Sequence, residues 1–207
     1  SAAQKPDAEL SALRVQLENG GDVKFGKQIE IARKGYSLAQ KEKSQNNLVF
    51  FAAALGDIFH FKSEMDSALH YHLIALKIYE KQNDFTGKGI VLNKIARVHR
   101  KLENTNKALN YYDLLLKLQV KQGNQEGIAV ALNESGVVYE QMGNQQEAQS
   151  RYRRSLEIQK ERKDSTGIGY ALSFIGYNYL IQSKWTESEK YLLESVFYFQ
   201  ETKDSFA

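Results

Sequence analysis

Apolar residues recur at helical spacing in segments that short polar clusters separate. Leu69, Leu73 and Leu76 share one face of a helix, and Leu109 and Leu116 continue the pattern 40 residues later. The clusters are rich in Asp, Asn, Ser, Thr and Gly, which favour turns and helix caps. The spacing predicts four pairs of helices, with first helices at 48–62, 87–102, 127–142 and 167–182 and second helices at 65–82, 105–122, 145–162 and 185–202.

These segments share one register when the chain is cut every 40 residues. Each pair has a small residue in both helices, which marks where the helices cross closest, so we expect Gly136 to pack directly against Ala148. Large rings are expected to fill the space between one hairpin and the next. Periods of about 20–50 residues are typical of stacked repeats, so the expected fold is all-α, a right-handed superhelical solenoid of antiparallel helix hairpins. The recurring residues are Gly56, Ala96, Gly136 and Gly176; Ala68, Ala108, Ala148 and Ser188; the rings Phe59, His99, Tyr139 and Tyr179; and the turn glycines Gly87, Gly127 and Gly167.

The start of the chain fits the register poorly. Residues 7–19 and 25–43 have the place of a helix pair, and the single proline, Pro6, precedes them. We therefore expect residues 1–47 to form an N-terminal cap and degenerate first repeat. Four repeats of the same solenoid are expected over 48–207, at about 48–86, 87–126, 127–166 and 167–206.

The end of the chain keeps the register. Ala207 stands in phase with the turn glycines, so we expect the chain to be a fragment of a longer protein. Terminal repeats normally carry a polar outer face. Leu180, Ile181, Tyr198 and Phe199 are apolar, and we expect a following helix or a neighbouring molecule to cover them.

Composition narrows the class of partner. The 28 Lys and Arg against 25 Asp and Glu give a net charge of +3, which is too balanced for a nucleic-acid-binding surface. The absence of cysteine excludes disulfides and thiolate chemistry. The longest apolar run, 48–55, is far shorter than the roughly 18 residues of a membrane span, so no membrane insertion is expected within this segment. The compartment stays open between cytoplasmic and extracytoplasmic (periplasmic).

The register resembles that of the tetratricopeptide repeat. That family has a period of about 34 residues, whereas this chain resembles the 40-residue variety of LGN/Pins-type adaptors and of sensor regions in bacterial signalling proteins such as sensor histidine kinases. The resemblance covers 48–207 and implies a solenoid that binds proteins or peptides. Ser188, Leu192, His72 and His99 depart from the pattern. The third repeat shows it most fully, at Leu132, Gly136, Tyr139, Gly143, Ala148, Tyr152 and Leu156.

Residue types that carry catalysis or bind metals form no recognisable set. His70 and His72 lie two residues apart on a helix, so they point to different faces and cannot share a metal ion. His72 and His99 occupy ring positions and are interpreted as packed structural residues. Gly87-Lys88-Gly89 lacks the third glycine and the lysine–serine ending of a phosphate loop. We expect a non-catalytic protein with no cofactor or metal.

The resemblance places the ligand site on the concave face, which the first helix of each pair lines. Asn93 and Asn133 share a position from which a side-chain amide can pair with an extended peptide backbone. The alternative is a solvated helix face with incidental asparagines. The candidate ligand-binding residues are Phe50, Asp57, His60, Asn93, Arg97, Arg100, Asn133, Val137, Glu140, Tyr170, Ser173 and Tyr177.

Basic residues gather in the middle of this face. Arg97 and Arg100, with Lys94 and Lys101, form a centre suited to acidic side chains or a terminal carboxylate. The alternative is an ordinary solvated run of charges.

The sequence therefore predicts a protein- or peptide-binding repeat scaffold, the sensing or docking region of a larger bacterial signalling protein. Two alternatives stay open: a self-association module that dimerises through the C-terminal repeat, and a regulatory phosphatase-like repeat protein.

Overall fold

The computed structural model describes residues 4–19 and 25–204, and all secondary structure in this part of the chain is α-helical. The all-α prediction is confirmed. The position of Ala207 lies outside the described residues. The helices are α1 (Gln4–Glu18), α2 (Phe25–Lys41), α3 (Gln45–Phe61), α4 (Met65–Gln82), α5 (Phe85–Lys101), α6 (Thr105–Gln122), α7 (Gln125–Gln141), α8 (Gln145–Arg162), α9 (Ser165–Ile181) and α10 (Trp185–Asp204).

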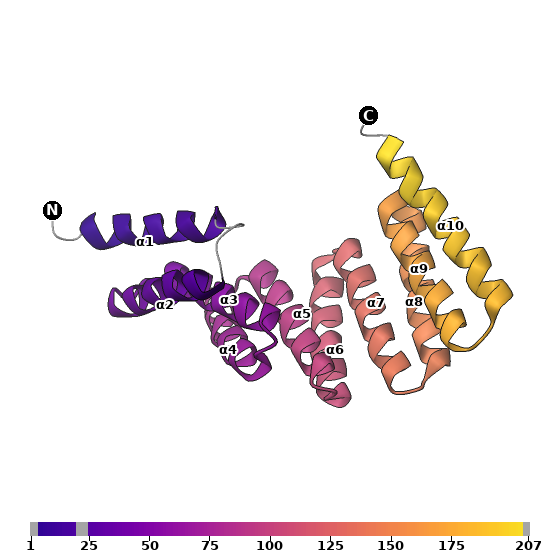
Figure 1. Cartoon of the computed structure of the whole chain (residues 1–207), viewed down its shortest axis with the longest axis horizontal. Coiled ribbons are helices and arrows are strands. Elements are labelled where there is room, and N and C mark those ends of the chain that lie inside the picture. The colour runs from indigo at the N-terminus through magenta and orange to yellow at the C-terminus, as the bar shows by residue number, and fades with distance from the viewer. Residues whose placement is uncertain (1–3, 20–24, 205–207) are drawn as a thin grey trace. The chain divides into compact units, whose positions relative to one another are not determined.

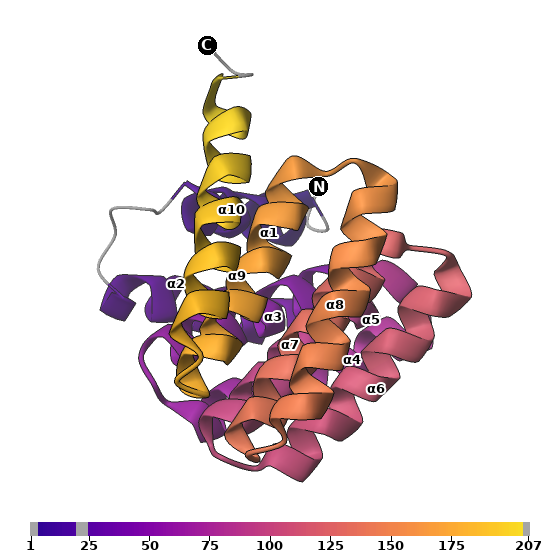
Figure 2. The ribbon, with the colours of Figure 1, turned by 90° about the vertical axis from the view of Figure 1, so that its right-hand side faces the viewer.

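The helices belong to two compact units, residues 1–102 and 103–207. Within each unit, helices that follow one another along the chain pack together, from α1 to α5 in the first unit and from α6 to α10 in the second (Figures 1 and 2). Consecutive antiparallel neighbours are the arrangement of helical-hairpin repeats. The division into an N-terminal cap and four repeats stays a prediction, because the unit boundary falls inside the second predicted repeat.

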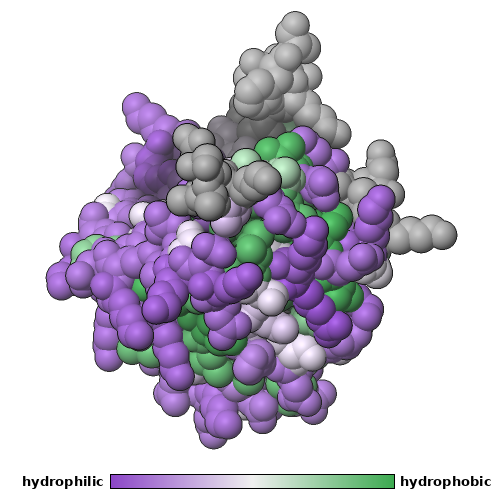
Figure 3. Space-filling view, turned by 90° about the vertical axis from the view of Figure 1, so that its left-hand side faces the viewer, coloured by the Kyte–Doolittle hydropathy of each residue, from purple (hydrophilic) through white to green (hydrophobic). Residues whose placement is uncertain are grey.

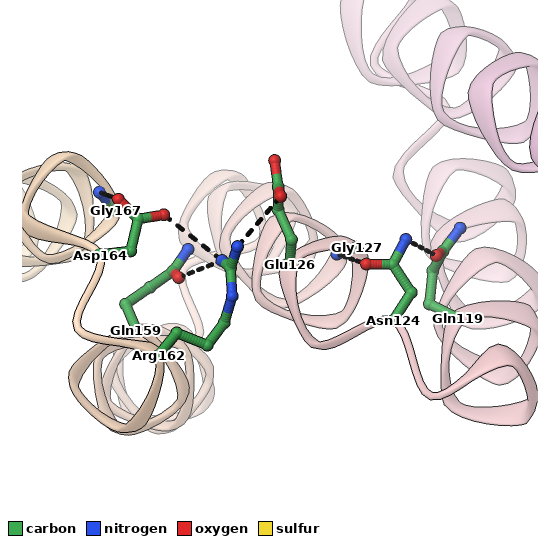
Figure 4. Close-up of polar contacts among 8 residues, drawn as sticks. All are labelled: Gln119, Asn124, Glu126, Gly127, Gln159, Arg162, Asp164 and Gly167. Carbon is green, nitrogen blue, oxygen red and sulfur yellow. Dashed lines mark hydrogen bonds and ion pairs between the residues drawn. The ribbon is translucent and has the colours of Figure 1, made fainter.

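The second helices of the first three pairs begin and end where the spacing predicts, but the first helices begin two or three residues earlier than predicted. The reason is the capping residue. The Asp164 carboxylate accepts a hydrogen bond from the Gly167 N–H at 2.9 Å, and Asn124 and Gly127 form the same contact at 3.1 Å (Figure 4). The side chain of an N-cap residue commonly bonds the third helical N–H. The turn glycine is therefore the third residue of the helix and not its first residue.

A residue with a left-handed backbone conformation occurs every 20 residues, in the turns within hairpins and in the turns between them. Such residues follow the first helices as well as the second helices, so the backbone repeats twice within each 40-residue unit of sequence. Only two of them are glycine, the residue that takes a positive φ most easily. They are Lys43, Ser63, Asn83, Glu103, Gly123, Gly143, Lys163 and Ser183.

Small residues let paired helices approach, but the partner of Gly136 differs from the prediction. A Cβ atom on Gly136 would lie 2.4 Å from Cε1 of Tyr152, and the nearest atoms all belong to this ring and not to Ala148. Tyr152 lies one helical turn beyond Ala148 on the same face. The crossing thus places a glycine under a ring, and Gly56 lies under His72 in the same way.

Rings of the first helices stack within their own hairpin and also reach the neighbouring hairpins, since Phe59 shares an apolar cluster with Ala32 of α2 and Val98 of α5. Phe59 stacks on Tyr71 at 5.7 Å between ring centroids, and Tyr179 stacks on Tyr191 at 5.5 Å. Tyr152, a ring of a second helix, likewise reaches the next hairpin, where it stacks on Phe174 of α9 at 5.2 Å.

The turn glycines serve a second close approach, between a second helix and the first helix that follows it. The Gln159 side chain lies over Gly167, where a Cβ atom would be 2.5 Å from its amide carbon, and Gln119 lies over Gly127. Arg162 donates to Gln159 at 2.6 Å and to Glu126 at 3.0 Å, which fixes this amide above the glycine (Figure 4).

The last hairpin exposes apolar side chains, though only partly those expected. Leu180 and Ile181 are exposed, whereas Tyr198 and Phe199 are half-buried because α10 turns them towards α9, where Phe199 meets Tyr170 edge-on at 5.1 Å. In the view of Figure 3, apolar side chains form separate patches among polar ones. The exposed apolar residues of α10 that the sequence did not single out are Trp185, Leu193, Val196 and Phe197.

Candidate functional site

A pocket of about 240 Å³ opens between helices α3, α4 and α5 of the first unit. It brings together three candidate ligand-binding residues, Asp57, His60 and Arg97. The other three lining residues are Lys94 of the predicted basic centre, His72, which was interpreted as structural, and Phe61, which the sequence analysis did not single out. We call this cavity the α3–α5 pocket. Its lining consists of Asp57, His60, Phe61, His72, Lys94 and Arg97.

Asp57 is the centre of the polar contacts in this pocket. Its Oδ2 accepts a hydrogen bond from the Lys94 ammonium at 2.6 Å, and its Oδ1 lies 3.8 Å from Nε2 of His72. Asp57 and Lys94 are both partly exposed, so the ion pair can be reached from solvent. The carboxylate that the sequence offered to a ligand is thus already engaged by a lysine of the neighbouring helix.

Burial disfavours the charged form of both histidines of the pocket. Burial lowers the pKa of His72 to about 4, and the nearby Asp57 carboxylate only partly opposes this effect. Burial also lowers the pKa of His60, and Lys101, Arg97 and Arg100 add to the effect. His60 Nε2 is buried and has no hydrogen-bond partner among the described residues.

The pocket carries a net positive charge. Lys94 is neutralised by Asp57, whereas Arg97 is exposed and forms no ion pair within the part of the chain that the structure describes. Arg100 and Lys101 lie close enough to act on the pKa of His60. Phe61, with 73% of its surface exposed, adds an apolar wall. The predicted basic centre therefore lies beside an exposed ring, a feature that the sequence analysis missed.

The remaining predicted residues of the first unit lie outside this pocket. Phe50 is half-buried beneath the Arg14 guanidinium, 4.2 Å from the ring centroid, so α1 covers it. Asn93 is half-buried and its Oδ1 is without a hydrogen-bond partner among the described residues. Arg100 is half-buried.

The predicted residues of the second unit divide into engaged polar groups and exposed rings. Asn133 is buried at 8% exposure, and Val137 packs against the apolar core of this unit. Ser173 donates to the Gly169 carbonyl at 3.0 Å and contacts the Ser195 hydroxyl at 2.6 Å. Tyr170 and Tyr177 are exposed.

Glu140 belongs to a buried network that sequence reasoning missed. Asn178, fully buried, donates to Glu140 Oε1 and to Gln145 Oε1, both at 2.7 Å, and accepts from Gln182 at 2.8 Å. Burial raises the pKa of Glu140, and the hydrogen bond from Asn178 works against that shift. A signal existed in the sequence, because the positions equivalent to Asn178 hold Ile58, Val98 and Val138.

Neither a membrane-spanning helix nor a metal-binding group of side chains occurs among the described residues. None of the helices there combines the length and apolarity of a membrane span. Nor do three or more histidine or acidic side chains come together in a metal-binding group in that part of the chain.

Comparison with known proteins identifies the repeat. The tetratricopeptide repeat family model matches residues 87–161, and no curated protein matches the chain. The apo form of RapI is 14% identical and superposes with a TM-score of 0.81 over 97% of this chain and 72% of its own. A second similar structure is a Signal Transduction ATPase with Numerous Domains (STAND) protein from Pyrococcus horikoshii, which has a tetratricopeptide repeat sensor. It is 18% identical and superposes with a TM-score of 0.79 over 96% of this chain and 31% of its own. A Rap protein complexed with competence and sporulation factor is 16% identical and superposes with a TM-score of 0.67 over 86% of this chain and 52% of its own. The sequence match assigns tetratricopeptide repeats to residues 87–161, and the similar structures share the fold over most of the chain.

Proposed function

We propose that this chain is a protein- or peptide-binding scaffold and that its first unit binds an acidic segment of a partner at the α3–α5 pocket. The observation that carries this proposal is Arg97, an exposed guanidinium without an ion-pair partner among the described residues, beside the exposed ring of Phe61. As proposed, the chain binds its ligand and does not transform it.

The charges of the pocket favour a carboxylate ligand. Lys94 and Arg97 outweigh Asp57, and burial disfavours the charged form of both histidines because it lowers the pKa of each. An arginine fork can hold a carboxylate through two parallel hydrogen bonds. The Phe61 ring offers apolar surface to the carbon chain that carries this carboxylate. Charge-assisted bonds contribute about 1.5–3 kcal/mol when desolvated, and less at a partly exposed site such as this one.

A sensing or docking role in signalling deepens this proposal. This proposal is supported by the similarity in fold between this chain and two solved structures. One is the STAND protein with a tetratricopeptide repeat sensor, and the other is a Rap protein complexed with competence and sporulation factor. We propose that this chain likewise supplies the binding region of a larger signalling protein.

Self-association is a second candidate, which the exposed face of α10 favours. Phe197 is 56% exposed, and the equivalent positions of the earlier repeats hold Lys77, Lys117 and Glu157. A ring in place of a charge raises the cost of leaving this face in water. Sedimentation equilibrium of the wild type and of Phe197→Lys tests this candidate. A dimer that the variant dissociates supports it, and a wild-type monomer at all concentrations rules it out.

A peptide array tests the main proposal. Its members vary the number and position of Asp and Glu, and each has a matched Asn or Gln version. We expect the acidic members to bind more tightly, and Arg97→Gln to remove most of the difference. Lys117→Gln, an equal change of charge on α6, is the control and should leave the preference intact. Equal binding of acidic and amide peptides, or equal loss in both variants, contradicts the proposal.

A further inference from the structure

A second concave site lies in the second unit. It is an open groove of about 590 Å³ between α8, the end of α9 and the start of α10, and we call it the α8–α9 groove. None of the described residues that line it carries a carboxylate. The residues that matter here are Gln149, Arg153, Tyr179 and Lys184.

Two cations of this groove converge on one tyrosine. Arg153 donates from Nη2 to the Tyr179 hydroxyl at 2.9 Å, and the Lys184 ammonium lies 5.7 Å from the centroid of the same ring. Tyr179 stacks on Tyr191, and Lys190 lies 5.9 Å from the centroid of that second ring. Since the Tyr179 hydroxyl accepts from Arg153, its own hydrogen stays free to donate. The groove thus presents positive charge and hydrogen-bond donors together.

An amide in the groove lacks the acceptor that it needs. Gln149 Nε2 is buried and has no hydrogen-bond partner among the described residues, while its Oε1 accepts from Arg153 Nε at 3.4 Å. Buried donors are normally paired, and an unpaired one is unfavourable. A bound acceptor at this point would satisfy the amide.

The groove residues also depart from the repeat pattern at a cost to the fold. Lys184 precedes α10 at the position where Asn144 precedes α8, and Asn144 accepts from the Glu147 N–H at 3.1 Å. Lysine cannot make this cap, and its charge opposes the positive end of the helix dipole. The position of Gln149 holds Leu69 and Leu109 in earlier repeats. An anionic ligand would compensate both departures.

We propose that the α8–α9 groove binds a phosphate group. A phosphate monoester carries nearly two negative charges and three acceptor oxygens at neutral pH, which matches two cations and several neutral donors better than a carboxylate does. Arginine holds such oxygens through its planar fork. The first residue of α8, Gln145, lines the groove, and a helix N-terminus favours an anion nearby. The phosphate can be free or can be carried on a side chain of a partner.

NMR titration tests this site directly. Inorganic phosphate and phosphoserine are each added to the isotope-labelled chain at constant ionic strength, with acetate as the comparison anion. We expect saturable shifts of the Arg153 Nε–H and Gln149 amide signals with both phosphates and not with acetate. Tighter binding of phosphoserine points to a phosphorylated partner, and equal binding points to free phosphate; either result supports the site.

Three variants separate the site from general charge. Lys184→Asn restores the residue found at the same position in two earlier repeats, so the variant should fold. It and Arg153→Gln should each weaken phosphate binding about tenfold, the loss expected for one charge-assisted contact. Lys117→Asn makes the same change of charge on α6, outside the groove, and should leave binding unchanged. Equal shifts with acetate, equal weakening in Lys117→Asn, or no saturable shift at Arg153 overturns the proposal.

Discussion

Replacing Gly136 by alanine tests how the hairpins pack. Gly136 lies inside α7, where alanine would normally stabilise a helix by about 1 kcal/mol. In this structure the added Cβ atom would lie 2.4 Å from Cε1 of Tyr152. Ordinary contact between carbon atoms needs about 3.5–4.0 Å, so the ring or the helix must shift by roughly 1 Å.

The ring has little freedom to shift. Tyr152 is fully buried, and its face stacks on Phe174 of the next hairpin with an angle of 15° between the ring planes. Overpacking costs about 1–3 kcal/mol, and an overlap of this size against a fixed ring belongs in the upper part of that range, at about 2–3 kcal/mol. After subtracting the gain in helix propensity, we expect Gly136→Ala to lower the free energy of unfolding by about 1–2 kcal/mol. In a chain of this size, that loss lowers the melting temperature by about 2–8 °C.

Urea unfolding followed by circular dichroism measures this loss. The control is Gly26→Ala in α2, where nothing outside the local helix lies within 4 Å of the added atom, so stability should stay equal or rise slightly. Combining Gly136→Ala with Tyr152→Leu should cost less than the sum of the single changes, because the smaller side chain relieves the overlap. A Gly136→Ala protein as stable as the wild type would refute the packing described here.

Three further changes probe individual contacts. Burial lowers the pKa of His72 from 6.5 to about 4, so the histidine of the unfolded chain takes up a proton at a higher pH than that of the folded chain. The free energy of unfolding should therefore fall by about 3 kcal/mol as the pH drops from 6.5 to about 4. Urea titrations at several pH values measure this dependence, which His72→Leu should abolish. Asp164→Ala removes the cap on Gly167 and should cost about 1 kcal/mol, measured the same way against Asp164→Asn, which keeps a capping oxygen. Lys163→Gly relieves a left-handed residue at φ 56° and should raise the melting temperature slightly; a lower value would contradict the assigned turn.

The helical pairs were predictable because the information for them is local. Apolar spacing fixes which face of each segment is buried, and polar clusters fix where it ends. The starts of the first helices were predicted too late because Gly127 and Gly167 were taken as the first helical residues. Asn124 and Asp164 were the better markers, since the N-cap side chain reaches the third N–H of the helix.

The candidate site was predictable only in part. Register alone brought Asp57, His60 and Arg97 together, because equivalent positions of neighbouring first helices lie on one face. Register does not say which side chains pair across helices. The engagement of Asp57 by Lys94 depends on the offset between two helices and on side-chain rotamers, neither of which is written in the spacing.

The closeness of Gly136 to Tyr152 shows the same limit. The sequence marked both positions as special, yet the pairing differed by one helical turn from the prediction. The relative shift of two antiparallel helices decides that pairing, and a shift of four residues keeps the same faces in contact.

Mapping the binding surface of the best acidic array peptide by NMR tests the central claim most directly. The account predicts shifts concentrated at His60, Lys94 and Arg97, saturation with added peptide, and weaker binding as salt is raised. Shifts confined to residues outside the α3–α5 pocket, or an affinity that neither salt nor Arg97→Gln changes, would contradict it.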